Sequence, residues 1–212
     1  MNNQPTVVLE ACVETFEQAV AAEKNGANRI ELCDRLDLGG TTPPLELTEK
    51  LLKTLKIPIM AMVRPRGGNF VHSDAEFQLM QQEVVRLKDL GCYGVVFGLL
   101  TPSGEIDVER TKKLADLARP MQVTFHKAFD DCPDLFKALE DLKKTGVDRL
   151  LTSGGKATAM EATELLNQLI EKSGGKPQLI VAGKVTHENI SELKTLIVKA
   201  KEFHGRRIVP GL

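Results

Sequence analysis

Short β-rich runs alternate with helical segments along the whole chain, and this alternation restricts the possible folds more than any other feature. The helical segments show apolar residues at helical spacing, as at Phe77, Met80 and Val84. The runs with strand character are residues 7–12, 29–33, 58–64, 93–98, 122–126, 149–152, 178–182 and 202–204. Strands that alternate with helices form a parallel sheet, because each helix carries the chain back to the edge where the next strand starts.

Eight such units predict a closed barrel. From Arg29 onward the strands begin roughly every 24 to 36 residues, which is the length of one βα unit. The sequence therefore predicts one domain over residues 1–212, an α/β fold of the TIM-type (β/α)8 barrel class. A doubly wound sheet is the alternative, but it needs a GxGxxG turn after the first strand, where residues 10–14 contain no glycine. Only residues 205–212 follow the last strand, so the eighth helix is expected to be short or missing.

Charge and hydropathy exclude several classes of partner. The formal net charge is -1 and the chain has no block of Lys or Arg, so we expect no nucleic-acid partner. The longest apolar runs, such as residues 57–63, are too short to cross a bilayer, so we expect no membrane partner. Residues 1–5 lack the basic start and the apolar stretch of a signal peptide. A cytoplasmic location is therefore expected, in which the four cysteines, scattered without a CxxC pair, are free thiols.

Polar side chains of one parity mark the inner wall of the predicted barrel. Successive strand residues face opposite sides, which turns Glu10 and Cys12 inward on the first strand and Glu31 and Cys33 inward on the second. Later strands contribute the inward polar residues Arg64, Thr124, His126, Thr152, Glu202 and His204. We expect all of them near the C-terminal ends of the strands, where barrels of this type carry their active sites. Arg64 is the expected counter-charge of Glu10 and Glu31, and a set of barrel-mouth residues that satisfy one another is the alternative to a functional pocket.

The same residues supply the groups that an enzyme needs for a small anionic substrate, a carboxylate or a phosphate. Glu10, Glu31 and His126 are candidate acid–base residues, and Asp130 is a candidate for orienting the base or a substrate hydroxyl. The candidate substrate-binding residues are Arg64, Arg66, Thr152, Ser153, Gly154, Gly155, Lys184 and His204. The two arginines offer bidentate contacts to an oxyanion, and segment 152–155 offers hydroxyls and free backbone N–H groups.

Seven short motifs are distinctive. They are IELCD at 30–34, GGTTP at 39–43, VRPRGGNF at 63–70, GVVFGLLT at 94–101, VTFHKAFD at 123–130, RLLTSGG at 149–155 and FHG at 203–205. In this order and at this spacing they resemble the CutC family, with similarity from about Leu9 to Gly205, and RPRGG and TFHKAFD are highly specific. The resemblance implies a TIM barrel, a cytoplasmic location and a role in copper homeostasis, with Cu(I) binding claimed for some members.

A copper role requires soft ligands, because Cu(I) prefers thiolate and thioether and accepts imidazole. Cys12 and Cys33 are the candidate Cu(I) ligands, since they are expected at equivalent inward positions on neighbouring strands. Two core cysteines beneath the pocket are the alternative interpretation. Cys92 precedes a strand and Cys132 lies beside Pro133, so neither is a candidate ligand.

The chain departs from the family pattern after the seventh and eighth strands. Members usually have a glycine triplet after the seventh strand, where this chain has Ala182, Gly183 and Lys184. They usually have a small hydroxyl residue after FHG, where this chain has Arg206. Barrels commonly bind phosphate at this rim through backbone N–H groups. Here Lys184 and Arg206 are expected to supply charge instead.

Two further alternatives concern binding and assembly. A barrel that binds or assembles without catalysis is a third class of function, because the fold alone does not fix the function. The missing eighth helix leaves Val7, Leu9 and Phe203 without their usual cover. The N-terminal tail, Ile208 with Val209, or a second subunit can fill that groove, and a homodimer is the solution that we predict.

Overall fold

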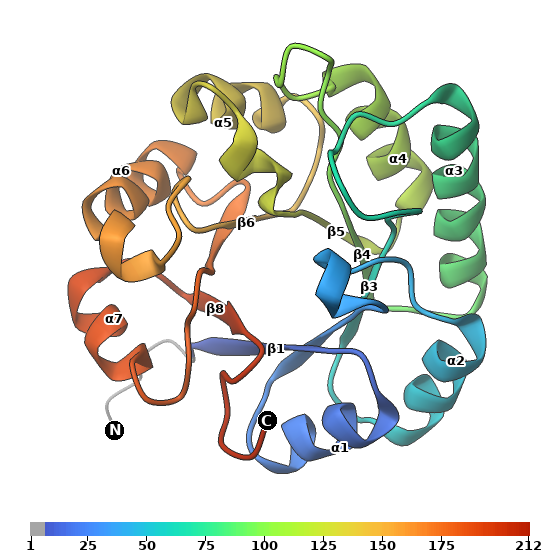
Figure 1. The fold of residues 1–212 in the computed structure, drawn as a ribbon, viewed down its shortest axis with the longest axis horizontal. Coiled ribbons are helices and arrows are strands. Elements are labelled where there is room, and N and C mark those ends of the chain that lie inside the picture. Colours follow the sequence, from blue (N-terminus) through green and yellow to red (C-terminus); the bar gives the residue numbers. More distant parts are fainter. Residues whose placement is uncertain (1–6) are drawn as a thin grey trace.

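Eight parallel strands pair in sequence order, and the last strand closes on the first (Figure 1). The strands are β1 (Val8–Val13), β2 (Arg29–Leu32), β3 (Ile59–Met62), β4 (Gly94–Phe97), β5 (Gln122–Phe125), β6 (Arg149–Thr152), β7 (Gln178–Val181) and β8 (Glu202–Gly205). The structure is a computed structural model and describes residues 7–212. The closed ring confirms the TIM-type barrel that the sequence predicts, and the doubly wound sheet is excluded.

Seven α-helices surround the ring, and within residues 7–212 no helix follows β8 (Figure 1). They are α1 (Phe16–Lys24), α2 (Leu45–Thr54), α3 (Asp74–Asp89), α4 (Val108–Ala118), α5 (Leu135–Lys143), α6 (Thr163–Ser173) and α7 (Ile190–Leu196). Short 3-10 helices lie in three loops, η1 (Leu36–Leu38), η2 (Lys127–Asp131) and η3 (Ala159–Ala162). Across the described part of the chain, no helix combines the length and apolarity that a membrane crossing requires.

Apolar side chains pack in two layers, one between the strands and the helices and one inside the ring. The outer layer contains fully buried strand residues such as Ile30 and Phe125 together with the apolar faces of the helices. The inner layer contains a small cluster made of Cys12, Cys33, Leu36, Met60, Met62 and Val96. This separation agrees with the side-chain parity that the sequence predicts for the first three strands, because alternate residues of a barrel strand face opposite sides.

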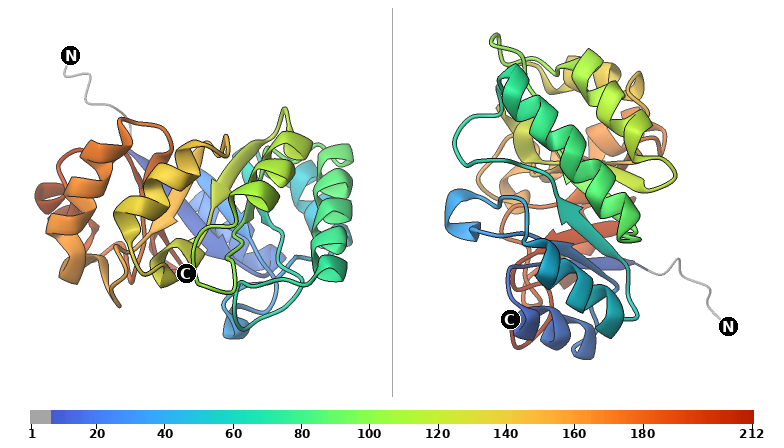
Figure 2. Two further views of the ribbon diagram at one scale, coloured as in Figure 1. Left: turned by 90° about the horizontal axis from the view of Figure 1, so that it is seen from above. Right: turned by 90° about the vertical axis from the view of Figure 1, so that its right-hand side faces the viewer.

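The loops that follow the strands build the C-terminal end of the barrel, where the predicted site lies. Figure 2 shows η1 projecting beyond the strands at this end. The loop between β2 and α2 folds back on itself, with paired backbone bonds between Asp34 and Thr41. It therefore lies over the mouth of the ring instead of continuing directly into α2.

The segment after β8 fills the place of an eighth helix. Ile208 and Val209 are 1% and 2% exposed, and they pack in the same core cluster as Phe203 and Ala22 of α1. Phe203 is fully buried, although the sequence predicts that it lacks cover. The expectation of a short or missing eighth helix is thus confirmed for the described residues. The segment after β8 covers much of the groove that the missing helix would leave open. An uncovered groove is therefore no longer an argument for a homodimer, and the homodimer stays a prediction.

Candidate functional site

Four inward side chains from β1, β2 and β8 meet at the centre of the barrel. In the register of the sheet, Glu10 lies opposite His204 and Cys12 lies opposite Glu31. The Nδ1 atom of His204 is 2.8 Å from Oε1 of Glu10, and its Nε2 atom is 3.7 Å from Oε2 of Glu31. Glu10 and Glu31 are 1% and 3% exposed. One imidazole therefore bridges two carboxyl groups that are removed from water.

Arg29, which the sequence analysis did not single out, is the counter-charge of Glu10. It is the first residue of β2, and its guanidinium pairs with both Glu10 and Glu202. Glu202 also pairs with Arg149 at 3.2 Å. Because Glu202 and Arg149 are the first residues of β8 and β6, this network lies toward the N-terminal end of the ring. The placement of Glu202 at the C-terminal rim was therefore wrong, and the strand parity of Glu31 would have identified Arg29 two residues before it.

The two inward cysteines lie close together, but not at equivalent positions. Cys12 is opposite Glu31, and Cys33 follows β2 with its backbone N–H bonded to the carbonyl of Val13. The donor atoms of Cys12, Glu31 and Cys33 nevertheless lie within 4.8 Å of one another. The sulfur of Cys33 is 3.6 Å from Oε2 of Glu31. Two sulfurs and one carboxyl oxygen thus form a buried group of possible metal ligands, here called the sulfur cluster.

The protons of this region are unevenly distributed. A hydrogen bond with Cys33, assisted by His204, lowers the pKa of Cys12 well below its usual value despite burial. The same bond and burial raise the pKa of Cys33. Burial raises the pKa of Glu31, whereas Arg29 and His204 outweigh the effect of burial on Glu10 and lower its pKa to about 2. These shifts favour the thiolate form at Cys12 and the carboxylate form at Glu10, whereas Cys33 and Glu31 hold their protons to higher pH.

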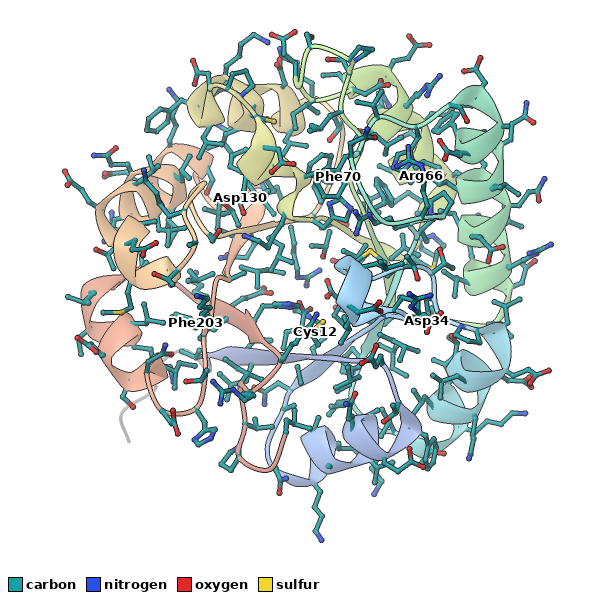
Figure 3. All side chains as sticks on the ribbon, in the orientation of Figure 1. Cys12, Asp34, Arg66, Phe70, Asp130 and Phe203 are labelled. Atoms are coloured by element: carbon teal, nitrogen blue, oxygen red, sulfur yellow. The ribbon has the colours of Figure 1, made fainter. Side chains whose placement is uncertain are left out.

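The loop that contains η1 covers the sulfur cluster. The backbone N–H of Leu36 donates to Oε2 of Glu14 at 2.9 Å, and the side chain of Arg206 donates to the carbonyl of Leu36. Gly40 packs directly on Cys33, since a Cβ atom at position 40 would lie 3.1 Å from the Cys33 sulfur. Figure 3 shows Cys12 inside the ring of strands, beside η1. This loop therefore shields the sulfurs from solvent, and it is held in place by Glu14 and Arg206, which directly follow β1 and β8.

Arg64 holds this loop and does not pair with either glutamate. Its guanidinium donates to the carbonyls of Leu38, Gly40 and Gly68, and it lies 4.7 Å from the centre of the Phe70 ring. It is 4% exposed, its Nε atom has no hydrogen-bond partner, and no carboxylate of residues 7–212 lies within ion-pair distance. The expectation that Arg64 neutralises Glu10 and Glu31 was therefore wrong.

Arg66 lies away from the mouth, although the same motif contains both arginines. Its guanidinium pairs with Glu76 of α3 and donates to the backbone carbonyls of Asn69 and Val71. Figure 3 shows it over the outer helices, far from Cys12. In this arrangement Arg66 braces the loop between β3 and α3, and its guanidinium is already saturated by protein acceptors.

His126 is buried on the other side of the mouth from His204. Its Nδ1 accepts a hydrogen bond from the N–H of Ala128, and its ring lies 4.8 Å from that of Phe70. Burial, reinforced by Arg64, lowers the pKa of His126 to about 3, so the ring is neutral. Gly98 makes room for it, because a Cβ atom there would lie 2.3 Å from Nδ1. The Nε2 atom has no hydrogen-bond partner among residues 7–212.

The backbone N–H groups of segment 152–155, predicted to be free for an anion, are largely taken up by Asp130. The Asp130 carboxylate accepts from the N–H of Ser153 at 3.1 Å and from that of Gly155 at 2.9 Å. It also accepts from the hydroxyl of Thr152 and pairs with Lys127. The N–H of Gly154 is bonded to the Thr152 hydroxyl. Asp130 thus occupies the position that the sequence assigns to a ligand, and it fixes the loop after β6.

Two cavities lie at the C-terminal end and are lined by some of the candidate residues, whereas Glu10, Glu31, His126 and the two cysteines line neither. One, of about 600 Å³, lies at the ends of β7 and β8 and is lined by His204, Lys184 and Arg206, among others. The other, of about 480 Å³, is lined by Arg64, Phe70 and Ser153 among others. Lys127 lines both. His204 and Arg64 thus line different cavities, so the single shared cavity expected from the sequence is not found among residues 7–212.

Comparisons with known proteins agree on one relationship. A sequence profile described as the CutC family matches residues 7–208. A family protein CutC from Vibrio vulnificus (strain YJ016) is 42% identical over 198 residues, 92% of this chain and 79% of that protein. The human copper homeostasis protein cutC homolog is 41% identical over 186 residues, 88% of this chain and 68% of that protein. The crystal structure of the putative copper homeostasis protein CutC from Streptococcus agalactiae superposes with a TM-score of 0.91 at 31% identity, over 96% of this chain and all of that one.

Proposed function

This chain belongs to the CutC family, and from that premise we propose that it binds Cu(I) between the sulfurs of Cys12 and Cys33 in the service of copper homeostasis. The observation that carries the proposal is the sulfur cluster, in which two sulfurs and one oxygen of Glu31 lie within 4.8 Å of one another. Thiolate sulfur is the ligand type that selects Cu(I) over harder cations. Residues of this kind fit the ion without any rearrangement of the strands that hold them.

The charge balance of the cluster also favours a monovalent cation. The hydrogen bond between the two thiols lowers the pKa of Cys12 and raises that of Cys33, so we expect the pair to hold one proton between its two sulfurs. When Cu(I) replaces that proton, the net charge of the buried group stays the same, and one proton is released. A divalent ion would add a charge in a region where burial penalises any excess charge. The proposal therefore specifies Cu(I), and it expects binding to weaken at low pH because metal and proton compete for sulfur.

The proposed setting is the cytoplasm, where reducing conditions keep thiols free. All four cysteines are free in the structure, and the pair in the barrel carries no disulfide. A reducing compartment maintains both the thiol state of the ligands and copper in the Cu(I) state. The η1 loop then separates the bound ion from water and from other thiols.

Competition with a Cu(I) chelator under anaerobic conditions tests the copper proposal. The variant Cys12→Ser with Cys33→Ser should lose stoichiometric Cu(I) binding while its circular dichroism spectrum stays unchanged. The matched control is Cys92→Ser with Cys132→Ser, which removes two buried thiols outside the cluster. An unchanged Cu(I) affinity of the Cys12 and Cys33 variant would show that this site does not bind copper.

A second candidate function is catalysis on a small anionic substrate, and one observation favours it. Through its two ring nitrogens His204 contacts Glu10, whose pKa is lowered, and Glu31, whose pKa is raised, and it also lines the 600 Å³ cavity. Groups whose pKa values are driven apart in this way serve as acid and base in many enzymes. Native mass spectrometry of protein purified anaerobically from copper-fed cells separates the candidates. Retained copper supports the first function, and a retained anionic molecule supports the second. If the protein retains no ligand, the result favours a barrel that serves in assembly without binding copper or an anion.

A further inference from the structure

The cavity at the ends of β7 and β8 has a strong excess of positive charge. Four basic side chains line it, from Lys127, Lys184, Arg206 and Arg207, and Glu188 is the acidic residue among its lining. Within residues 7–212, Lys184, Arg206 and Arg207 form no ion pair. Arg206 donates to the carbonyl of Leu36, which is a neutral acceptor, so its charge stays uncompensated. Clefts lined by one sign of charge concentrate ligands of the opposite sign.

Hydrogen bonds tie together the backbone around the cavity, so the positions from which these basic side chains extend are set before any ligand arrives. The N–H of His187 donates to the carbonyl of Arg207 at 2.8 Å, which ties the loop after β7 to the segment after β8. The side chain of Asn189 accepts from the N–H of Thr186 and donates to the carbonyl of Lys184, both at 2.9 Å. Preorganised donors bind an anion more tightly than mobile ones, because less conformational entropy is lost.

Lys184 has a backbone conformation that its side chain disfavours. Its φ is 54°, in the left-handed region that glycine adopts freely and other residues rarely adopt. The side chain is exposed and makes no hydrogen bond or ion pair with residues 7–212, so it contributes little to folding. Strained residues of this kind gather at binding sites, so this conformation is consistent with a role of the ammonium group in binding a ligand.

We propose that this cavity binds a small phosphate monoester, whose phosphate is held by Lys184, Arg206 and Arg207. A doubly charged oxyanion matches the forked guanidinium groups and the compact ammonium group. The volume of about 600 Å³ exceeds that of a phosphate group alone and leaves room for a short organic part that extends toward His204. This inference does not depend on copper binding, because none of the three basic residues belongs to the sulfur cluster.

Isothermal titration calorimetry with inorganic phosphate and with propyl phosphate tests the site. Both probes should bind once per chain, and propyl phosphate should bind at least as tightly as phosphate. The variants Lys184→Gly and Arg207→Gln should each weaken binding about tenfold or more, the loss expected for one charge-assisted hydrogen bond. Glycine accepts the same φ, so Lys184→Gly should keep or raise the melting temperature, and weaker binding is then not a folding defect.

Two controls make the result decisive. Lys194→Gln removes an exposed positive charge from α7 outside the cavity and should leave the affinity unchanged. Cys12→Ser with Cys33→Ser should also leave phosphate binding unchanged, which separates this site from the copper proposal. The inference is overturned if neither probe binds saturably at millimolar concentration. It is equally overturned if Lys194→Gln weakens binding as much as Lys184→Gly does, or if Lys184→Gly and Arg207→Gln have no effect.

Discussion

Charged side chains inside the barrel form a continuous series of ion pairs, in which each charge lies beside one of opposite sign. Arg149 and Arg29 compensate Glu202, Arg29 and His204 compensate Glu10, and His204 also faces Glu31 (Figure 3 shows the neighbouring Cys12). Each of these charges would be costly alone in a region of low dielectric constant. The ionisation of the site at the mouth therefore depends on an arginine near the other end of the ring.

Replacing Arg29 tests this dependence. Arg29→Met leaves Glu10 and Glu202 with less compensation, and breaking a buried ion pair costs about 3–5 kcal/mol, so we expect the free energy of unfolding at pH 7 to fall by that amount. Urea denaturation measures it. Arg35→Met, which breaks an exposed pair with Asp37, is the control and should change little.

The pH dependence of the same variant has a definite sign. Burial raises the pKa of Glu10, but Arg29 and His204 lower it overall from 4.5 to about 2. Its stabilising contribution is therefore present above pH 4.5 and disappears as the pH falls toward 2. In Arg29→Met, Glu10 takes up a proton at higher pH, so the stability difference from the parent should narrow as the pH is lowered from 7. A difference that stays constant with pH would contradict this account of Glu10.

The two inward histidines should differ in charge. Burial lowers the pKa of His204, but Glu31, Cys12 and Glu10 outweigh it and raise the pKa well above 6.5, whereas burial lowers that of His126 to about 3. In the metal-free protein at pH 7, ¹⁵N NMR should therefore show a protonated ring for His204 and a neutral ring for His126. The contribution of His204 to stability should be complete below pH 6.5 and disappear as the pH rises through its raised pKa. A neutral His204 at pH 7 would also argue against a thiolate at Cys12.

At the scale of elements, η1 and its loop control access to the sulfur cluster. The loop is held by Glu14 after β1, by Arg64 after β3 and by Arg206 after β8. All three residues contact backbone N–H or carbonyl groups of the loop. The position of the loop therefore depends little on the identity of its side chains. Under the copper proposal, an ion that enters or leaves would have to pass Leu36, which belongs to the same buried cluster as both cysteines.

Loosening the loop should accelerate copper exchange without changing the ligands. Glu14→Ala removes the acceptor for the N–H of Leu36, and one hydrogen bond of about 1 kcal/mol corresponds to roughly fivefold faster transfer of Cu(I) to a chelator. The equilibrium affinity should stay within twofold or so, because the sulfurs are untouched. Stopped-flow transfer measures the rate. Glu17→Ala, at an exposed position of α1, is the control, and equal rates for all three proteins would refute the role of the loop.

The elements were largely predictable from the sequence, and the site was predictable in part. Alternating apolar residues identified every strand to within a residue or two, and parity identified Glu10, Glu31 and the cysteines as inward-facing. Register was not predictable, because the stagger of a closed ring depends on all eight strands together, and this placed Cys12 opposite Glu31. The partners of Arg64 and Asp130 are backbone groups of distant loops, and no sequence pattern reports such contacts.

At the scale of the whole molecule, the segment after β8 completes the outer wall. Ile208 and Val209 occupy the space that an eighth helix would fill, and Phe203 is fully buried beneath it (labelled in Figure 3). Two apolar side chains in a short irregular segment thus replace the several that a helix contributes. The homodimer stays a prediction.

Truncating these side chains should destabilise the molecule. Ile208→Ala should lower the free energy of unfolding by about 2–5 kcal/mol, the usual cost of a cavity left by a buried Ile. Val198→Ala, at a position that is 77% exposed, is the control and should have little effect. Multi-angle light scattering at micromolar concentration reports the assembly state of the parent and both variants. A mass of one chain for the parent would show that the homodimer prediction is wrong, and an unchanged stability of Ile208→Ala would show that the tail does not serve as cover.

Ring closure by β1 and β8 has a consequence for how the protein is made. The bond between Glu10 and His204 joins residues 194 positions apart, so it forms only after nearly the whole chain has left the ribosome. Until then Cys12 lacks the imidazole that helps to keep it a thiolate, and it behaves as an ordinary thiol of a growing chain. Any premature product that stops before β8 carries the proposed ligands Cys12, Glu31 and Cys33 without the imidazole of His204. Under the copper proposal, such a truncated chain should compete for Cu(I) less well than a chain that includes β8.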